Sequence, residues 1–223
     1  AKSAAVAGNV LCFGRRQHRT DVRCPADVRF VKGFDKKGVP IYDWPKYLGF
    51  VLSSIKPIMR GKLNLPRLWS RVGSLHGNSF SDIPEDGASY TNNQRAIPDI
   101  ENPEAEHQGT SRQDEYYFDV IDAIASRDLD GLNKLLNANG LESISDVEMD
   151  LLFNDYIDYI RGTEEIFKGV KERVGRDIDV KYGLFGYAAP WIKDGEVLLN
   201  GGATQYTLPL SIQQLIELGV LKN

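Results

Sequence analysis

The most regular pattern of apolar positions lies between residues 114 and 174, and it is helical. Apolar side chains recur there at intervals of about three and four residues, which places them on one face of an α-helix. In the first part of this stretch they are Tyr117, Val120, Ile121, Ile124, Ala125, Leu129, Leu132, Leu135 and Leu136. The pattern stops at Gly140, and glycine commonly ends helices. We therefore predict helical structure from Asp114 to this glycine.

A second helical pattern begins at an N-terminal signal. Ser145 and Glu148 have the spacing of a capping box, in which each side chain satisfies a backbone N–H group at the start of a helix. The apolar residues that follow are Leu151, Leu152, Tyr156, Ile157, Tyr159 and Ile160. A further helix is expected to carry Ile166, Phe167, Val170 and Val174 and to end at Gly175.

Strand-like patterns flank the helical stretch on both sides. Before it, Leu63, Leu65, Leu68 and Trp69 approximate a strand that glycines interrupt just after Arg71. After it, a β pattern resumes near residue 180, and a short amphipathic helix follows that ends at Gly219. These segments together predict an α+β fold.

Length and composition describe an ordinary globular chain. Its 223 residues can bury a sizeable core, and 42% of them are apolar and 26% charged. No apolar run approaches the length that crosses a bilayer, and the first residues lack the pattern of a signal segment. We therefore expect no membrane insertion, and either an excised fragment or a cytosolic protein.

Charge and cysteine content narrow the function classes. The net charge of −4 and a pI near 5.5 differ from the basic surface of a nucleic-acid binder, so nucleic acid is not an expected partner. Cys12 and Cys24 are compatible with one disulfide or with two thiols. With two cysteines and three histidines, we predict no metal site.

Residues 186–206 carry the most concentrated candidate chemistry. Gly201 and Gly202 allow a sharp turn and a close approach of the backbone to a ligand. Gln205 follows, between Thr204 and Tyr206, where a rigid element would hold it. This stretch is either a glycine-rich hairpin in which the glutamine satisfies backbone groups, or part of a ligand site.

Two arginines form the second candidate feature. Arg71 precedes Gly73 and Gly77, and Arg95 precedes Pro98. A pyrophosphate needs bidentate donors and a backbone that can come near, and arginines beside glycine turns supply both. Taken alone, such arginines are more often surface or structural residues.

Several motifs, in this order, resemble the tuberculosis-necrotizing-toxin family of NAD glycohydrolases. They are an aromatic and proline segment from Tyr42 to Phe50, Arg71-Val72-Gly73-Ser74 with Gly77 and Phe80, Arg95-Ala96-Ile97-Pro98, Pro190-Trp191, Gly201-Gly202-Ala203-Thr204-Gln205-Tyr206, Leu208-Pro209, Leu215-Ile216 and Gly219-Val220-Leu221. The resemblance implies a small twisted antiparallel β core within a domain at 35–223. Residues 1–34 would be an N-terminal extension, and residues from about 111 to 178 a helical insertion.

The resemblance also implies the roles of individual residues. Gln205 and Arg71 would be catalytic, and the amide oxygen of the glutamine would orient water or a ribose hydroxyl. The implied substrate-binding residues are Arg95, Phe80, His107, Ser74, Trp191 and Thr204. In this scheme Arg71 and Arg95 clamp phosphates, and Phe80 stacks on a ring of the substrate.

Two features depart from the family pattern. Residues 192–200, IKDGEVLLN, replace a shorter link before the Thr-Gln-Tyr motif. The turn between Arg71 and Phe80 also differs in length, which leaves Ser79 as the alternative to Phe80. Tyr42 and Trp44 are expected to form core or rim rather than to contact the substrate.

By this resemblance, the expected activity is hydrolysis of NAD+ and NADP+ at the nicotinamide–ribose bond, without a cofactor. The family implies a C-terminal toxin domain of a secreted bacterial protein, which acts in the cytoplasm of the target cell and has a cognate immunity protein. Outward acidic residues expected to stay free for such a partner are Asp128, Asp130, Asp150, Asp155 and Asp158. The open alternatives are an ADP-ribosyl cyclase or ADP-ribosyltransferase, a nuclease toxin that uses His76 or His107 with Arg71, and a non-catalytic binding module.

Overall fold

A computed structural model of the chain provides the structure. It describes residues 5–7, 10–12, 28–38, 40–98, 106–170 and 178–223. Cys24 and the side chain of Cys12 lie outside the described part, as do Val174 and Gly175, so the predictions that concern them stay open.

The described residues form a seven-stranded sheet with the strand order β13-β8-β6-β7-β12-β9-β5. Every neighbouring pair in this sheet is antiparallel. Its strands are β5 (Lys56–Pro57), β6 (Leu68–Val72), β7 (Ser79–Asp82), β8 (Glu106–Ser111), β9 (Leu184–Tyr187), β12 (Thr204–Thr207) and β13 (Leu221–Lys222). Together with the helices described below, this sheet confirms the α+β prediction.

Among the described residues, three antiparallel pairs of strands lie outside this sheet. They are β1 (Ala5–Ala7) with β2 (Val10–Cys12), β3 (Val31–Phe34) with β4 (Pro40–Tyr42), and β10 (Trp191–Lys193) with β11 (Glu196–Leu199). The β10–β11 hairpin is formed by the IKDGEVLLN segment that departs from the family pattern. Its turn places Asp194 at φ 51° and Gly195 at φ 80°, and an Asp-Gly pair suits a two-residue hairpin turn with positive φ.

The α-helices are α1 (Asn92–Arg95), α2 (Tyr116–Ala125), α3 (Leu129–Ala138), α4 (Asp146–Ile166) and α6 (Ile212–Glu217). Short 3₁₀ helices are η1 (Val28–Phe30), η2 (Tyr47–Gly49) and η3 (Leu52–Ser54). Apolar spacing predicts the regions of α2, α3, α4 and α6, whereas α1 and the short 3₁₀ helices were not predicted. None of the helices in the described part of the chain is long and apolar enough to cross a membrane.

The helix boundaries confirm some predictions and correct one. The capping box of Ser145 and Glu148 is present at the start of α4. The prediction that a separate helix begins near Ile166 is wrong, because α4 continues without a break as far as that residue. The chain turns between α2 and α3 at Arg127, which has φ 51°, and Asp128 caps α3 by accepting a hydrogen bond from the backbone N–H of Gly131 at 2.9 Å.

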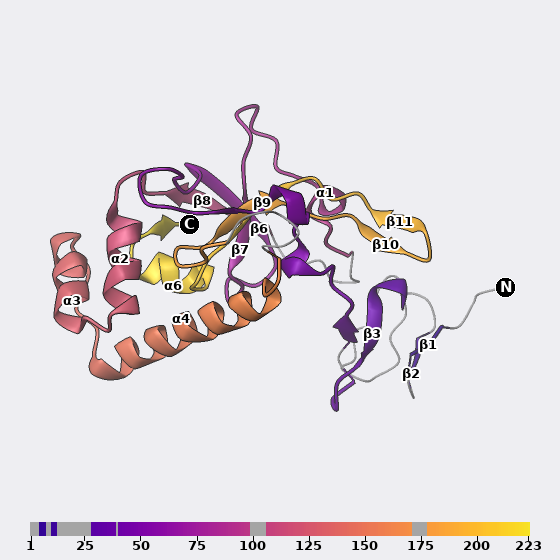
Figure 1. Ribbon diagram of the computed structural model, residues 1–223, viewed down its shortest axis with the longest axis horizontal. Helices are drawn as coiled ribbons and strands as arrows, with labels where there is room; N and C mark the ends of the chain where they lie inside the picture. Colours follow the sequence, from indigo (N-terminus) through magenta and orange to yellow (C-terminus); the bar gives the residue numbers. More distant parts are fainter. Residues whose placement is uncertain (1–4, 8–9, 13–27, 39, 99–105, 171–177) are drawn as a thin grey trace.

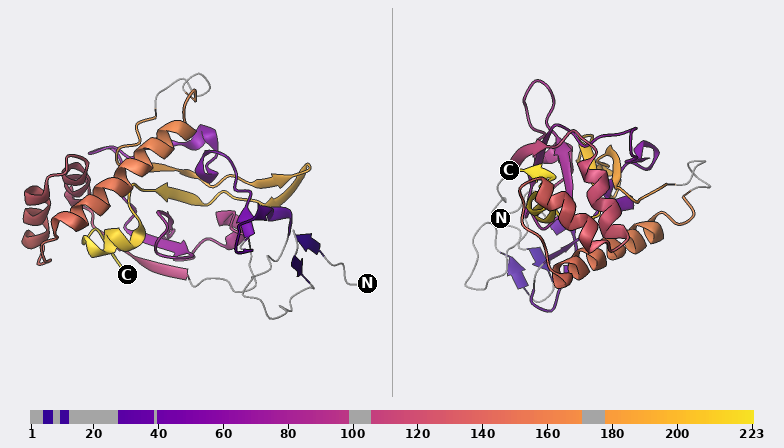
Figure 2. Two further views of the ribbon diagram at one scale, coloured as in Figure 1. Left: turned by 90° about the horizontal axis from the view of Figure 1, so that it is seen from below. Right: turned by 90° about the vertical axis from the view of Figure 1, so that its left-hand side faces the viewer.

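Helices and sheet share one hydrophobic core. Its largest cluster includes Tyr117 and Ile121 from α2, Trp69 from β6 and Tyr206 from β12. Figure 1 shows α2 and α3 at one end of the molecule, α4 running from that end toward the middle, and the β10–β11 hairpin projecting in the opposite direction; Figure 2 shows the same arrangement from below. The predicted helical insertion therefore packs on the sheet rather than standing apart from it.

The end of the predicted N-terminal extension is bound to the β10–β11 hairpin. Phe30 lies edge-on to Trp191, with ring centroids 5.0 Å apart. The Arg29 guanidinium pairs with Glu196 at 2.8 Å, and Lys193 Nζ donates to the Arg29 carbonyl at 2.8 Å. The chain just before residue 34 thus supports the hairpin.

Three of the acidic side chains expected to stay free are engaged within the chain. Asp128 caps α3, Asp150 forms an ion pair with Arg127, and Asp155 accepts a hydrogen bond from Gln214 Nε2 at 2.7 Å. The expectation is wrong for these residues, because local capping and packing between helices place a donor beside each carboxylate.

Candidate active site

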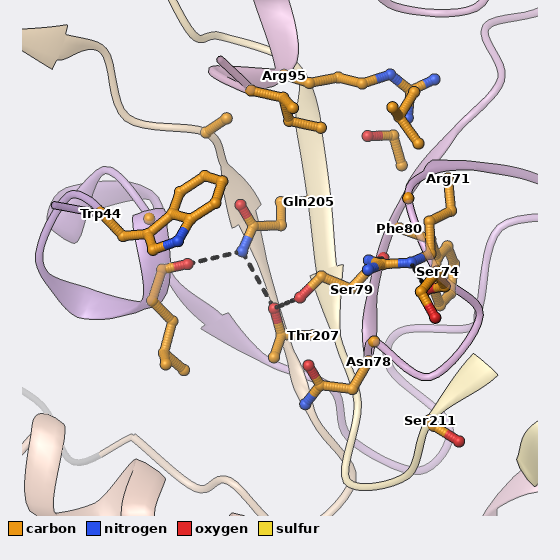
Figure 3. A pocket seen from close by; sticks show the side chains of 18 of the residues that line it. Trp44, Arg71, Ser74, Asn78, Ser79, Phe80, Arg95, Gln205, Thr207 and Ser211 are labelled. Carbon is orange, nitrogen blue, oxygen red and sulfur yellow. Dashed lines mark hydrogen bonds between the residues drawn. The ribbon is translucent and has the colours of Figure 1, made fainter. Parts of the chain in front are cut away.

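A cleft of about 1070 Å³ opens between several segments of the chain. Its lining comes from residues 42–49, the turn between β6 and β7, residues 92–98, residues 188–189, strand β12, residues 209–214 and the C-terminal half of α4. Of the predicted site residues, the cleft is lined by Arg71, Ser74, Phe80, Arg95, Thr204 and Gln205. Figure 3 shows Gln205 with Trp44 on one side and Arg71 on the other. Residues more than a hundred positions apart in the sequence are thus brought together, as the ordered motifs predict.

The amide of Gln205 has a defined orientation. Its Nε2 donates one hydrogen bond to the carbonyl oxygen of Leu48 at 2.9 Å and another to Thr207 Oγ1 at 3.1 Å. A backbone carbonyl can only accept, so the nitrogen and not the oxygen of the amide must face Leu48. Both amide hydrogens are thereby used, and Oε1 is the atom that Gln205 can offer as an acceptor to a ligand in the cleft (Figure 3).

The Leu48 carbonyl reaches Gln205 because the backbone of η2 has left-handed geometry. Tyr47 has φ 57°, Leu48 has φ 58° and Gly49 has φ 80°. For residues other than glycine this region costs about 1–2 kcal/mol each, and such strain is typical of functional sites. The Ala189 N–H donates to the Gly49 carbonyl at 2.7 Å and so ties this turn to the segment after β9.

Thr207 and Ser79 form the second support for Gln205. Residues two apart in a strand point to the same face, so Gln205 and Thr207 share one face of β12. Ser79 lies opposite Thr207 on β7, and their hydroxyl oxygens are 2.8 Å apart. Thr207 is only 3% exposed but lines the cleft together with Gln205 and Ser79, so the hydrogen-bonded chain of these three residues forms part of the cleft floor.

Phe80, the neighbour of Ser79, belongs mainly to the core. Its ring stacks on Tyr206 with centroids 5.4 Å apart and an interplanar angle of 6°, and it is 3% exposed. Burial raises the pKa of the Tyr206 hydroxyl well above its usual range. Stacking of Phe80 on a substrate ring stays a prediction. Ser79, the alternative equivalent of the family's aromatic residue, contacts the Thr207 hydroxyl that positions Gln205.

Arg71 organises the turn between β6 and β7. Its Nε donates to the Ser74 carbonyl at 2.7 Å, and its Nη1 donates to the Ser79 carbonyl at 2.6 Å. A Cβ at Gly77 would lie 2.0 Å from Arg71 Nη2, so this position requires glycine for the guanidinium to fit. The side chain therefore shapes the turn and presents positive charge to that end of the cleft.

Arg95 lies deeper, with a side chain only 4% exposed. Its Nε donates to the Tyr90 carbonyl at 2.9 Å, Nη1 to the Ser70 carbonyl at 3.2 Å, and Nη2 to Ser70 Oγ at 2.6 Å and Glu106 Oε1 at 3.3 Å. Burial lowers the pKa of this guanidinium, and the Glu106 carboxylate partly offsets that effect. The geometry favours a structural role, and phosphate binding by Arg95 stays a prediction.

The remaining predicted residues divide between the cleft and its surroundings. Ser74 is exposed on the turn, and Thr204 Oγ1 donates to Asp82 Oδ1 at 2.5 Å. His107 lies opposite Arg71 on strand β8, and Trp191 is buried at 3% exposure against Phe30. Within the described residues, neither His107 nor Trp191 lines the cleft.

Comparisons of the chain with protein-family models, curated proteins and solved structures found no match. Among the residues that the structure describes, there is also no group of three or more His, Cys, Asp or Glu side chains arranged to hold a metal ion.

Two contributions to the cleft are missed by the sequence motifs. The first is the pair of supports for Gln205, of which Thr207 carries a readable signal because it stands two residues further along the same strand. The Leu48 carbonyl carries none, since its direction depends on backbone angles. The second is α4, whose side chains Asp158, Tyr159 and Thr163 line the cleft. The predicted insertion thus supplies one of its walls.

Proposed function

We propose that this cleft binds NAD+ and hydrolyses its nicotinamide–ribose bond, with NADP+ as a second substrate, on a fold of the tuberculosis-necrotizing-toxin type. The observation that carries the proposal is the oriented amide of Gln205, whose Oε1 is left to accept a hydrogen bond in the cleft. The cleft volume of about 1070 Å³ lies near the upper end of the range for ligand pockets, which suits a dinucleotide.

The proposed reaction places modest demands on the side chains. The bond between the anomeric carbon and the nicotinamide nitrogen breaks, and its electron pair goes to the nitrogen, which was cationic and leaves neutral. No general acid is therefore needed. Water adds to the anomeric carbon and releases a proton to solvent, which yields ADP-ribose. Gln205 Oε1 accepts a hydrogen bond from that water or from a ribose hydroxyl and fixes it beside the developing positive charge.

The pyrophosphate is assigned to the end of the cleft at the β6–β7 turn. Arg71 supplies positive charge there, and the exposed hydroxyl of Ser74 lines the same wall. Figure 3 places Arg71 and Ser74 on one side of Gln205 and Trp44 on the other, so phosphates and nicotinamide would lie on opposite sides of the glutamine.

Incubation of the purified chain with NAD+ and NADP+ tests the activity. Chromatography should show nicotinamide and ADP-ribose, or its 2′-phosphate, accumulating in equal amounts. Cyclic ADP-ribose or a modified acceptor would instead support the cyclase or transferase alternative. Intact NAD+ after prolonged incubation would refute the proposal, and RNA incubated in parallel checks the nuclease alternative.

Gln205→Ala connects the activity to the site. Loss of an oriented polar contact in the transition state is expected to lower turnover by about 10²-fold. Gln213→Ala is the matched control, because Gln213 also donates from Nε2, to Glu217 at 3.0 Å on α6, but does not line the cleft. Equal turnover by the two folded variants would remove Gln205 from the mechanism.

The biological setting proposed here rests on the family resemblance. The chain would act as a delivered toxin domain that depletes NAD+ in the cytoplasm of a target cell, and a cognate immunity protein would block it in the producer. Cytoplasmic expression of the chain should lower cellular NAD+ and arrest growth, and Gln205→Ala should abolish both effects. Growth arrest by that variant would show that NAD+ depletion is not the cause.

A further inference from the structure

We propose that Trp44 is a stacking platform in the cleft that binds the cationic pyridinium ring of nicotinamide while it is attached to ribose. The inference rests on the proposed function for its substrate, and it assigns to Trp44 a direct contact that the sequence does not predict.

The first observation is the exposure of Trp44. Its surface is 54% exposed, whereas the other two tryptophans, Trp69 and Trp191, are buried. Trp44 also lines the cleft. A large apolar side chain that stays exposed inside a concave site is informative, because burying it against a planar ligand is favourable.

The second observation is the support behind the ring. Trp191 packs against Trp44 with centroids 5.0 Å apart and an interplanar angle of 47°, and Phe30 packs edge-on to Trp191. The Tyr42 ring also lies near the Trp44 ring, with centroids 6.1 Å apart. Because the buried Trp191 packs against it, Trp44 can offer a ring face to a ligand with little loss of conformational freedom.

The third observation is the position of the ring relative to the proposed reaction centre. Figure 3 shows Trp44 on the side of Gln205 away from Arg71, and Leu48, whose carbonyl orients the Gln205 amide, follows Trp44 in the same cleft-lining segment. A ring stacked on Trp44 would place the attached ribose next to Gln205 Oε1. The phosphates would then extend toward Arg71, as assigned above.

The chemistry of the ring decides which part of the dinucleotide fits. The face of an indole carries negative charge density and attracts a cation placed over it. The nicotinamide ring is a pyridinium cation before the glycosidic bond breaks and neutral afterwards. Adenine is neutral throughout. Trp44 therefore favours the nicotinamide end of the intact substrate and loses most of that attraction once nicotinamide is released, which assists its departure.

Binding of small probes tests this without relying on catalysis. The probes are the 1-methylnicotinamide cation, neutral nicotinamide and AMP, titrated against the wild-type chain, Trp44→Phe and Trp44→Leu and followed by NMR shifts. The wild type should bind the cation about ten-fold more tightly than nicotinamide. Trp44→Phe should retain part of this preference, and Trp44→Leu should lose it. Tyr187→Leu is the matched control, because Tyr187 is an exposed aromatic outside the lining of the cleft.

The outcomes separate this proposal from the proposed hydrolysis. If the chain binds the cation in a Trp44-dependent way but leaves NAD+ intact, the platform is supported and the proposed hydrolysis is refuted. Equal binding of cation and neutral probe by the wild type overturns the platform, even if NAD+ is consumed. Loss of AMP affinity in Trp44→Leu with unchanged affinity for the cation also overturns it, because adenine would then be the stacked ring.

Discussion

Replacing Thr207 with valine removes one of the two supports of the Gln205 amide and leaves the shape of the side chain nearly unchanged. The lost hydroxyl accepts from Gln205 Nε2 at 3.1 Å and is 2.8 Å from Ser79 Oγ. The Leu48 carbonyl still accepts from Nε2 at 2.9 Å, so the amide keeps one support. The variant therefore tests orientation rather than the presence of the glutamine.

The magnitudes follow from these contacts. A neutral hydrogen bond contributes about 1 kcal/mol, so the loss of both should lower the free energy of unfolding by roughly 2 kcal/mol. Without the hydrogen bond to Thr207, the reactive orientation of the Gln205 amide should be about 1 kcal/mol less stable relative to other orientations. This corresponds to roughly a five-fold decrease in kcat. KM should change little, because the substitution alters no group assigned to substrate binding.

The assay measures kcat and KM for NAD+ and unfolding in urea for three variants. Thr207→Ser keeps the hydroxyl and should restore kcat. Thr110→Val makes the same substitution on β8 of the sheet, away from the cleft, and should leave both constants unchanged. A folded Thr207→Val protein with wild-type kcat would refute the argument that this hydroxyl orients Gln205.

Three further predictions concern stability. Arg95→Met should lower the free energy of unfolding by roughly 3 kcal/mol, because it removes charged hydrogen bonds to Ser70 and Tyr90; a stable variant with a raised KM for NAD+ would instead support phosphate binding. Gly201→Ala should cost roughly 2 kcal/mol by urea unfolding, since φ is 68° and a Cβ would lie 2.5 Å from the Ala188 carbonyl; an unchanged midpoint would contradict this. Burial raises the pKa of Asp122, but hydrogen bonds from Tyr182, Lys181 and Arg60 outweigh it and lower the pKa below its usual value. The charged Asp122 carboxylate therefore contributes its full stabilisation of the fold above its unfolded-state pKa of about 4. This contribution is lost as the pH falls through the folded-state pKa. Asp122→Asn should cost less than about 1 kcal/mol at pH 7, because the pairs are exposed, and the cost should shrink as the pH falls through the folded-state pKa; a loss that does not change with pH would exclude this linkage.

Local sequence patterns were enough to predict the class of fold and much of the local structure. Apolar spacing and the capping box at Ser145 depend on interactions between residues close in the chain, so α2, α3 and the start of α4 could be predicted from it. The Gly201-Gly202 turn could be anticipated for the same reason, because φ of 68° and 94° suits glycine at both positions. Several candidate site residues, Gln205 and Arg71 among them, were also found, because ordered motifs mark them.

The surroundings of those residues depend on contacts that form in the folded chain. The direction of the Leu48 carbonyl depends on backbone angles and on contacts with a strand far along the chain, so no local pattern reveals that it orients Gln205. Arg71 and Arg95 look alike in sequence, and both donate to backbone carbonyls, but Arg95 is buried whereas Arg71 is partly exposed. Trp191, which the resemblance assigns to substrate binding, is buried against Phe30, whereas Trp44 is exposed in the cleft. Such differences arise from contacts between segments distant in sequence, which residue spacing does not encode.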